Sequence, residues 1–353
     1  MSQISHIPST ALTLSDADQQ ALTDLYVRGT PANTLRAYER DLIYITAWKA
    51  ARFAAPLDWP EKEDVAIAFI LDHARDLRNV DRSDHGRNAA AALITAKLRK
   101  SLACPAPSTL ERRIASWQAF HRMKNIASPF DMPMVRQTRA KARRAAARTR
   151  APKSEKPIVR DVLQDMLATC EGQGIRGRRD KAILLLGWAS GGRRRSEIAG
   201  LMYEDLELSD FAEEGLIWIQ LVGTKTTQKG RTPKLVLKGI AARGLMDWLI
   251  ASDITDGPLF RPISKSGRPL ARPLSADGVY EIVKKRLSLA GLPRNFASPH
   301  GLRSGFLTQA ALDGTPIQAA MRLSLHRSVA QAQKYYDDID IAVNPATDLL
   351  DKD

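Results

Sequence analysis

The first third of the chain carries apolar residues at helical spacing and shows no strand-like alternation. After a lead over residues 1–14 that is expected to be flexible, Ser15 has the position of a helix cap, and Asp18 three residues later partly completes a capping box. Four more helices are predicted: one opening at Thr30-Pro31, one after Trp59-Pro60 with Val65 and Phe69, one from Ala89 to Leu98, and one capped by Ser108 with Leu110, Ile114 and Trp117 on one stripe. The pattern predicts an all-helical domain over residues 15–134.

Beyond residue 157 the pattern becomes mixed. Two β-rich runs, Leu216 to Val222 and Leu235 to Leu237, predict a hairpin with its turn between Lys225 and Lys234. Helices are predicted around it at 180–189, 194–201, 240–250, 276–289, 300–312, 317–325 and 329–336. The sequence therefore predicts a mainly α protein, whose second domain, residues 158–336, adds a small antiparallel sheet. A tail over 337–353 follows, in which Pro345 can restart a helix.

Positive charge is concentrated between these two regions. The 353 residues carry a net charge of +14 with a pI near 9.9, which indicates a polyanionic partner. Ten Lys or Arg and only one acid, Glu155, lie between Arg136 and Arg160. A charge run is usually a solvated face, but between two patterned regions it favours a linker, residues 135–157, that follows DNA. Its predicted DNA-contacting residues are Arg136, Arg139, Lys141, Arg143, Arg144, Arg148, Arg150 and Lys153.

Several classes of protein receive no support. The two cysteines, Cys104 and Cys170, lie far apart and are expected to be buried apolar residues, not a disulfide or a zinc site. No metal site, no cofactor and no glycine-rich nucleotide loop is expected. No signal peptide is visible, and the longest apolar run, Ala182 to Ala189, is too short to cross a bilayer. A cytoplasmic protein without membrane contact, associated with the nucleoid, is expected.

Candidate chemistry is concentrated toward the end of the chain. His300 and Arg303 stand three residues apart, so both side chains face the same way from one helical turn, and His326 and Tyr335 follow. Guanidinium groups match phosphate oxygens, imidazoles donate hydrogen bonds to them, and a phenol can attack phosphorus. The set therefore suits chemistry on a phosphodiester. Two more elements lie upstream: the run from Gly192 to Glu197, which contains three arginines, and Lys225.

This order of residues resembles the catalytic set of the tyrosine recombinase (phage integrase) family, and the flanking sequence resembles its Cre-type members most. The resemblance implies that Tyr335 is the nucleophile, because the family places that residue nine positions after the second histidine. The family pattern Arg-x-Ser-Glu selects Arg194 from the three arginines. The implied catalytic residues are Arg194, Lys225, His300, Arg303, His326 and Tyr335, and Glu197 orients Arg194. Lys225 would protonate the leaving 5′-oxygen, and Lys229 is the alternative in that role.

Two positions depart from the family pattern. Arg193 stands where the family usually has an apolar residue, and a surface salt bridge or a DNA contact is expected for it and for Arg195. Leu325 replaces the glycine that usually precedes the second histidine, so a different local backbone geometry is expected there.

The resemblance implies a site-specific recombinase. Such an enzyme cleaves and rejoins double-stranded DNA at an inverted-repeat site through a 3′-phosphotyrosyl intermediate. It exchanges strands through a Holliday junction, as a homotetramer on two sites that is a monomer or weak dimer when free. A C-terminal helix with Leu349 and Leu350 would dock on the next protomer. A type IB topoisomerase-like enzyme, a hairpin-telomere resolvase and a catalytically silent DNA-binding regulator remain alternatives.

Overall fold

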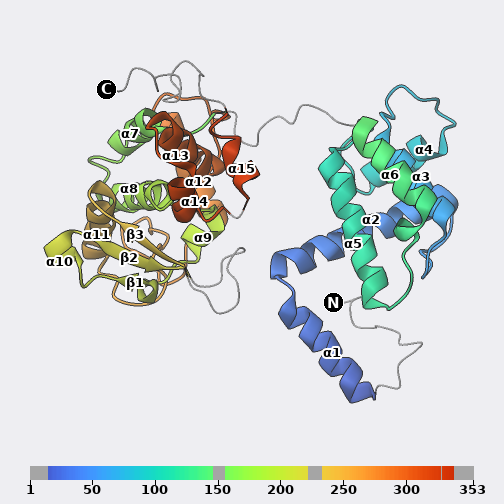
Figure 1. The fold of residues 1–353 in the computed structure, drawn as a ribbon, viewed down its shortest axis with the longest axis horizontal. Helices are drawn as coiled ribbons and strands as arrows, with labels where there is room; N and C mark the ends of the chain where they lie inside the picture. Colours follow the sequence, from blue (N-terminus) through green and yellow to red (C-terminus); the bar gives the residue numbers. More distant parts are fainter. Residues whose placement is uncertain (1–14, 146–155, 222–232, 327, 338–353) are drawn as a thin grey trace, which may run out of the picture. The chain divides into compact units, whose positions relative to one another are not determined.

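Two compact units make up the chain, Met1–Arg150 and Ala151–Asp353, and each has its own hydrophobic core (Figure 1). The structure is a computed structural model, and it describes residues 15–145, 156–221, 233–326 and 328–337. Three parts of the prediction lie outside the described residues: the lead over 1–14, the predicted hairpin turn with Lys225 and Lys229, and nearly all of the tail.

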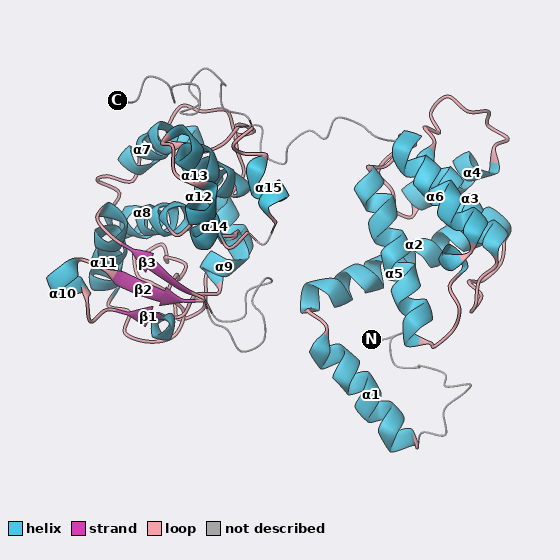
Figure 2. Ribbon diagram, viewed as in Figure 1, coloured by secondary structure: helices cyan, strands magenta, loops and turns pink. Residues whose placement is uncertain are grey.

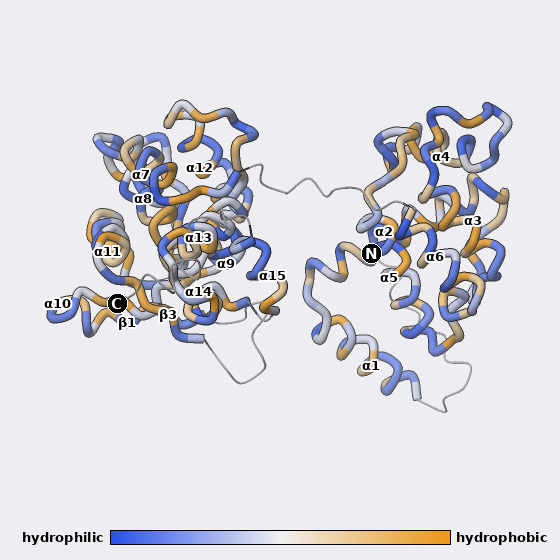
Figure 3. The backbone as a smooth tube through the Cα atoms, turned by 45° about the horizontal axis from the view of Figure 1, so that its top comes forward, coloured by the Kyte–Doolittle hydropathy of each residue, from blue (hydrophilic) through white to orange (hydrophobic). Residues whose placement is uncertain are grey.

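The N-terminal unit is all-helical in its described part, as predicted. Its elements are α1 (Asp16–Gly29), α2 (Ala32–Phe53), α3 (Glu63–Ala74), α4 (His85–Thr95), α5 (Pro107–Met123), the 3-10 turn η1 (Pro129–Asp131) and α6 (Pro133–Ala145). Each of these helices carries both apolar and polar positions (Figure 3). The apolar positions of α2, α3 and α5 meet through edge-to-face rings: Phe69 lies 4.9 Å from Trp48 and 5.4 Å from Trp117 between ring centroids.

The helix starts follow local capping chemistry. Ser15 accepts a hydrogen bond from the Asp18 amide in a complete capping box, which confirms the predicted first helix. Ser108 does not cap α5, because Pro107 already occupies the first helical position and the cap is Ala106. The fourth helix begins four residues before the predicted Ala89, where Asp84 caps it by accepting from the Arg87 amide.

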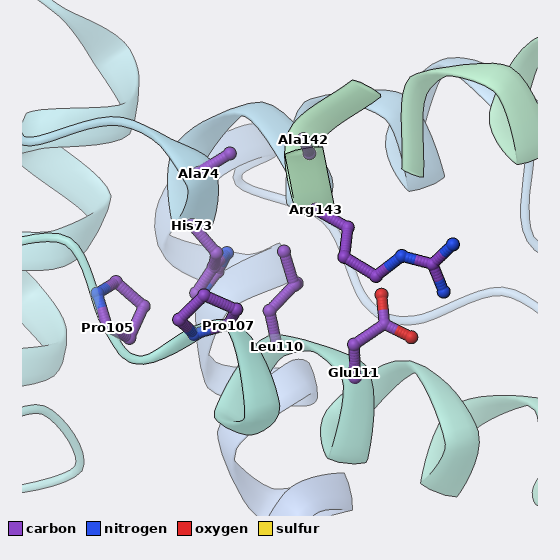
Figure 4. Close-up of a pocket in the computed structure, with 8 residues that line it drawn as sticks. All are labelled: His73, Ala74, Pro105, Pro107, Leu110, Glu111, Ala142 and Arg143. Carbon is purple, nitrogen blue, oxygen red and sulfur yellow. The ribbon is translucent and has the colours of Figure 1, made fainter. Parts of the chain in front are cut away.

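The start of the predicted linker is wrong. Residues 133–145 form α6, which packs on α3 through Val135, a fully buried residue. Arg139 holds the same helix to α5, since its Nη2 lies 2.6 Å from Glu111 Oε2. A small pocket marks this junction, with His73 of α3, Leu110 of α5 and Ala142 of α6 in its lining (Figure 4). Residues 146–155, with Arg148, Arg150 and Lys153, lie outside the described part.

The C-terminal unit is mainly helical with one small sheet, which confirms the predicted fold class (Figure 2). Its helices are α7 (Arg160–Ala168), α8 (Gly174–Ala189), α9 (Arg195–Ala199), the 3-10 turn η2 (Tyr203–Asp205), α10 (Phe211–Glu214), α11 (Ile240–Ser252), α12 (Ala276–Leu289), α13 (His300–Leu312), α14 (Ile317–Ser324) and α15 (Val329–Gln333). Its strands are β1 (Leu206–Glu207), β2 (Ile217–Gln220) and β3 (Lys234–Leu237), antiparallel in that order. The β2–β3 pair is the predicted hairpin.

Helix α8 lies at the centre of this unit. Its run from Ala182 to Leu186 is at most 3% exposed, and it packs against α11 and α13. Cys170 is buried as expected, whereas Cys104 of the N-terminal unit is only partly buried, and neither forms a disulfide. Among the described helices, none combines the length and apolar composition that crossing a bilayer requires.

Candidate active site

The turn between α8 and α9 brings the first candidate residues onto α13. Gly191 and Gly192 have φ angles of +93° and +75°, in the left-handed region that favours glycine. A Cβ on Gly192 would lie 2.2 Å from the Cα of Arg303, and one on Gly191 would lie 2.3 Å from the carbonyl carbon of Leu323. The turn therefore runs in direct contact with both α13 and the end of α14. Figure 1 shows α9, α13, α14 and α15 close together in this unit.

Arg194 is the last residue before α9, and Glu197 holds it. Its Nη1 donates to Glu197 Oε1 at 2.6 Å, and its backbone N–H donates to Oε2 at 3.1 Å. The side chain of Arg194 is 39% exposed, so the guanidinium is oriented but still open to a ligand. This is the contact expected from their spacing on one helical turn.

Arg193 does form a salt bridge, with Nη1 3.8 Å from Glu197 Oε2, but its side chain is only 2% exposed, so the expected surface position is wrong. Its Nη2 donates to the carbonyl oxygen of Leu323 at 2.7 Å, which ties the α8–α9 turn to the end of α14. Burial lowers the pKa of Arg193 to about 10, partly offset by Glu197. Arg195 does form the expected surface salt bridge, with Nη1 2.7 Å from Asp277 Oδ1.

Arg303 lies on α13 beneath that turn and is 4% exposed. Its Nη1 donates to the Gly192 carbonyl at 3.1 Å, and its Nη2 lies 3.1 Å from both ring nitrogens of His326. Burial, and then the charges of Arg193 and Arg194, lower the pKa of Arg303 to about 10. The group is still a cation at neutral pH.

His326 follows α14 through Leu325, which has φ 54° and ψ 39°. Leu325 therefore adopts the left-handed conformation that a glycine favours. A different backbone geometry was expected at this position, and the structure does not show one. The Nδ1 of His326 lies 2.8 Å from the hydroxyl oxygen of Ser324. Burial, followed by the charge of Arg303, lowers the pKa of His326 to about 4, so the ring is neutral at pH 7.

Tyr335 lies in the turn after α15, since this helix ends at Gln333, before the predicted end at residue 336. Its hydroxyl lies 3.4 Å from Nε2 of His300, the first residue of α13, and its ring centroid is 6.3 Å from that of His326. Burial raises the pKa of Tyr335, and Arg303 partly offsets this. Tyr336 differs, because its hydroxyl donates to the backbone carbonyl of Thr315 at 3.0 Å.

Five of the predicted catalytic residues are thus brought together: Arg194, His300, Arg303, His326 and Tyr335. They converge from the α8–α9 turn, the start of α13, the end of α14 and the turn after α15. The first of these is distant in sequence, since Gly192 and Arg303 are 111 residues apart. The sequence did not identify Ser324, which contacts His326, or the buried Arg193, which bonds to the Leu323 carbonyl. Both contacts depend on the folded backbone and leave no pattern in the sequence. Among the described residues, no group of His, Cys, Asp and Glu could hold a metal ion.

Two cations, two imidazoles and a phenol that lie close together can bind a phosphodiester and attack it. The guanidiniums suit the non-bridging oxygens, on which negative charge grows during attack. His300 suits the role of accepting the phenol proton. Its 3.4 Å distance is long for a hydrogen bond, as is usual for catalytic contacts without substrate.

This chain is similar to known recombinases along most of its length. An integrase/recombinase of Selenomonas ruminantium, described as a xerD homolog, is 29% identical over 311 residues, which are 86% of this chain and 81% of that protein. A tyrosine recombinase of Synechococcus elongatus is 28% identical over 318 residues, covering 86% of this chain and 84% of that protein. The predicted closeness to Cre-type members stays a prediction.

Solved structures share the fold. The Tn1549 transposon integrase in complex with transposon right end DNA has a TM-score of 0.57 at 16% identity, covering 94% of this chain and 97% of that one. A lambda integrase dimer bound to a COC′ core site has a TM-score of 0.53 at 15% identity, covering 91% and 78%. The model of the phage integrase family matches residues 157–340, more than half of the chain and all of the site described above. This chain belongs to the phage integrase family.

Proposed function

We propose that this chain is a site-specific recombinase that cleaves and rejoins double-stranded DNA through Tyr335. Its family and its relatives make it a tyrosine recombinase. The observation that carries the assignment of Tyr335 is the direction of its hydroxyl. It faces His300 at 3.4 Å and lies beside His326, whereas the hydroxyl of Tyr336 is bonded to a backbone carbonyl.

In the proposed cleavage step, the Tyr335 oxygen attacks the scissile phosphorus and its proton passes to Nε2 of His300. Arg194, Arg303 and His326 hold the non-bridging oxygens as charge develops on them. The bond from phosphorus to the 5′-oxygen breaks, and Lys225 supplies a proton to that oxygen. A 5′-hydroxyl and a 3′-phosphotyrosyl bond result. Attack of a 5′-hydroxyl on that bond reverses the step without ATP, because one phosphodiester replaces another.

The proposed partner is DNA with an inverted-repeat site, bound by a tetramer on two sites. The net charge of +14 and the basic residues of α6 support DNA binding. Solved relatives in complex with DNA, such as the Tn1549 transposon integrase, agree with this choice of partner. We place the enzyme in the compartment that holds the DNA, in association with the nucleoid.

The experiment uses purified protein and a supercoiled plasmid that carries two copies of the DNA flanking its own locus. We expect an SDS-resistant protein–DNA adduct, DNA attached to the peptide that contains Tyr335, and recombinant circles. Absence of any adduct on this and on random-sequence DNA would contradict the proposal. Relaxation of the plasmid without exchange would favour a topoisomerase-like enzyme instead.

A further inference from the structure

Ser324 is buried at the edge of the candidate site and is not explained by packing alone. It is the last residue of α14, is 0% exposed, and has its hydroxyl 2.8 Å from Nδ1 of His326. The buried serines Ser190 and Ser304 differ, because their hydroxyls donate to backbone carbonyls three or four residues earlier. No carbonyl of the described residues accepts from Ser324, so the ring nitrogen is the acceptor available to its proton.

Local backbone geometry makes this contact possible. Residues two apart would point in different directions along a continuing helix, but Leu325 ends α14 with φ 54°. The reversal turns the His326 ring back onto Ser324. Arg193 holds the preceding residue, since its Nη2 donates to the Leu323 carbonyl at 2.7 Å. Ser324 and the ring are therefore fixed relative to the α8–α9 turn.

Arg303 also contacts this ring: its Nε donates to Nε2 of His326 at 3.3 Å, which is longer than the 2.8 Å between Ser324 Oγ and Nδ1. Its Nη2 lies 3.1 Å from both Nδ1 and Nε2 of His326. These two nitrogens flank one carbon, so an atom equidistant from them at that distance in the ring plane would collide with that carbon. Nη2 must therefore lie over the ring face, as arginine often does on planar rings. The in-plane position of Nδ1 is left to the Ser324 hydroxyl, and this 2.8 Å contact is shorter than the 3.3 Å contact between Arg303 Nε and Nε2.

The ring has a choice of tautomer because it is neutral. Burial lowers the pKa of His326 to about 4, and a neutral imidazole carries one proton on either nitrogen. Only the tautomer with the proton on Nε2 can donate from that nitrogen to a phosphate oxygen. The group that bonds to Nδ1 decides between the two forms.

We propose that Ser324 is a positioning residue that donates to Nδ1 of His326 and so keeps the ring proton on Nε2, the nitrogen that donates to the scissile phosphate. The inference rests on the proposed function, because it assigns the direction of a hydrogen bond to the DNA backbone. It also makes a statement about the free protein, which can be tested without DNA.

The first test measures the tautomer directly, by ¹⁵N nuclear magnetic resonance of the histidine side chains at pH 7. The chain has six histidines, and the signals missing in His326→Ala identify those of His326. We expect the wild-type signals of a ring protonated on Nε2, and in Ser324→Ala a shift toward a mixture of both tautomers. A wild-type ring protonated on Nδ1 overturns the proposal, and this result needs no folded variant of Ser324.

The second test measures covalent adduct formation on the DNA substrate. Ser324→Ala should slow the reaction about 10-fold, in the range seen when a group that orients a metal-ligating histidine is removed, with DNA affinity unchanged. Ser324→Thr keeps the hydroxyl and should restore most of the rate. The matched control is Ser252→Ala, which removes a buried hydroxyl from α11 and should leave the rate as it is.

A double-mutant cycle separates positioning from a structural role. If Ser324 acts through the His326 ring, adding Ser324→Ala to His326→Ala should not slow adduct formation further, because the double variant has no imidazole whose tautomer could be selected. The proposal is contradicted if the fold-loss in rate of the double variant equals the product of the fold-losses of the two single variants. A wild-type protein that forms no adduct contradicts the proposed function instead, while the nuclear magnetic resonance result still decides the tautomer.

Discussion

Tyr335 and Tyr336 are adjacent, but their hydroxyls have different surroundings. Tyr335→Phe should abolish the covalent adduct and leave DNA affinity nearly unchanged, because it removes one oxygen and no charge. Tyr336→Phe is the matched control: it loses a hydrogen bond to the Thr315 carbonyl and should retain cleavage. The measurement is the adduct on a denaturing gel. An adduct that persists in Tyr335→Phe and is lost in Tyr336→Phe would reverse the assignment.

The three consecutive arginines have three different environments. Arg194→Ala should slow cleavage about 100- to 1000-fold or more, since a preorganised donor to the developing charge is lost. Arg195→Ala removes an exposed salt bridge to Asp277 and should change the rate little. Single-turnover cleavage rates compare the two variants. A larger loss in Arg195→Ala would show that the pattern Arg-x-Ser-Glu selects the wrong residue.

At the scale of residues, the sequence could predict what a motif contains and not what the fold adds to it. The choice of Arg194 with Glu197 as its partner follows from spacing on one helical turn, and the structure contains that contact. The buried position of Arg193 could not be predicted. Its partner, the carbonyl of Leu323, lies 130 residues away in the sequence. An arginine in a charged run is ordinarily exposed, so local composition favoured the wrong environment.

The α8–α9 turn depends on a glycine that can be tested against a control of similar conformation. Gly192→Ala places a Cβ 2.2 Å from the Cα of Arg303, while Gly172, with a similar φ of +69°, has no atom within 4 Å of such a Cβ. Both variants should lose about 1–2 kcal/mol of unfolding free energy from the left-handed backbone. Gly192→Ala should lose roughly 1–3 kcal/mol more from the clash and cleave more slowly. Denaturant unfolding compares them, and equal losses would contradict the close approach.

Helix α3 carries a histidine that should make the N-terminal unit sensitive to acid. His73 is buried between Tyr44 and the Phe69 carbonyl, and burial lowers its pKa from 6.5 to about 3. The unfolded chain therefore binds a proton near pH 6.5 that the folded unit does not. The contribution of neutral His73 to the unfolding free energy is fully present above pH 6.5 and is lost as the pH falls toward 3. The unfolding free energy should fall by up to about 1.4 kcal/mol per pH unit in this range.

His73→Gln, which has no charge to gain, should flatten this slope between pH 6.5 and 5. Hydrogen exchange of the α3 amides measures it, and exposed His85 on α4 provides the control variant His85→Gln. An identical slope in wild type and His73→Gln would contradict the buried neutral histidine.

At the scale of elements, long amphipathic helices were predictable and charged or very short elements were not. The ranges of α12 and α13 agree with the sequence pattern because their apolar positions recur strongly. Helix α6 was not predictable, because its apolar face consists mainly of Val135 and Ala142, too few positions to give a helical pattern among its many basic residues. Strand β1 has two residues, too few to show alternation.

At the scale of the whole molecule, the division into a helical unit and a mixed catalytic unit followed from the change of pattern along the chain. The excess of positive charge, +14, is a property of the whole molecule. The basic residues of α6 differ in whether they are paired with an acid or exposed. Arg139 is committed to Glu111, with three hydrogen bonds to that carboxylate, whereas Arg143 and Arg144 are exposed.

This difference leads to a prediction about salt. Replacing Arg143, Arg144 and Arg148 with Gln should weaken binding to all DNA sequences alike, because phosphate contacts carry no base information. The slope of log affinity against log salt concentration should become shallower by about 0.9 for each phosphate that the variant no longer neutralises. Fluorescence anisotropy with a labelled duplex at several salt concentrations measures it.

Arg139→Gln is the matched control, with the same loss of charge per residue. It should loosen α6 from α5 and lower the unfolding free energy, while its salt slope stays close to that of the wild type. A triple variant with an unchanged slope would show that these arginines do not touch phosphate. A slope that falls in Arg139→Gln by as much per charge would mean that net charge alone, and not the exposed face of α6, sets the affinity for DNA.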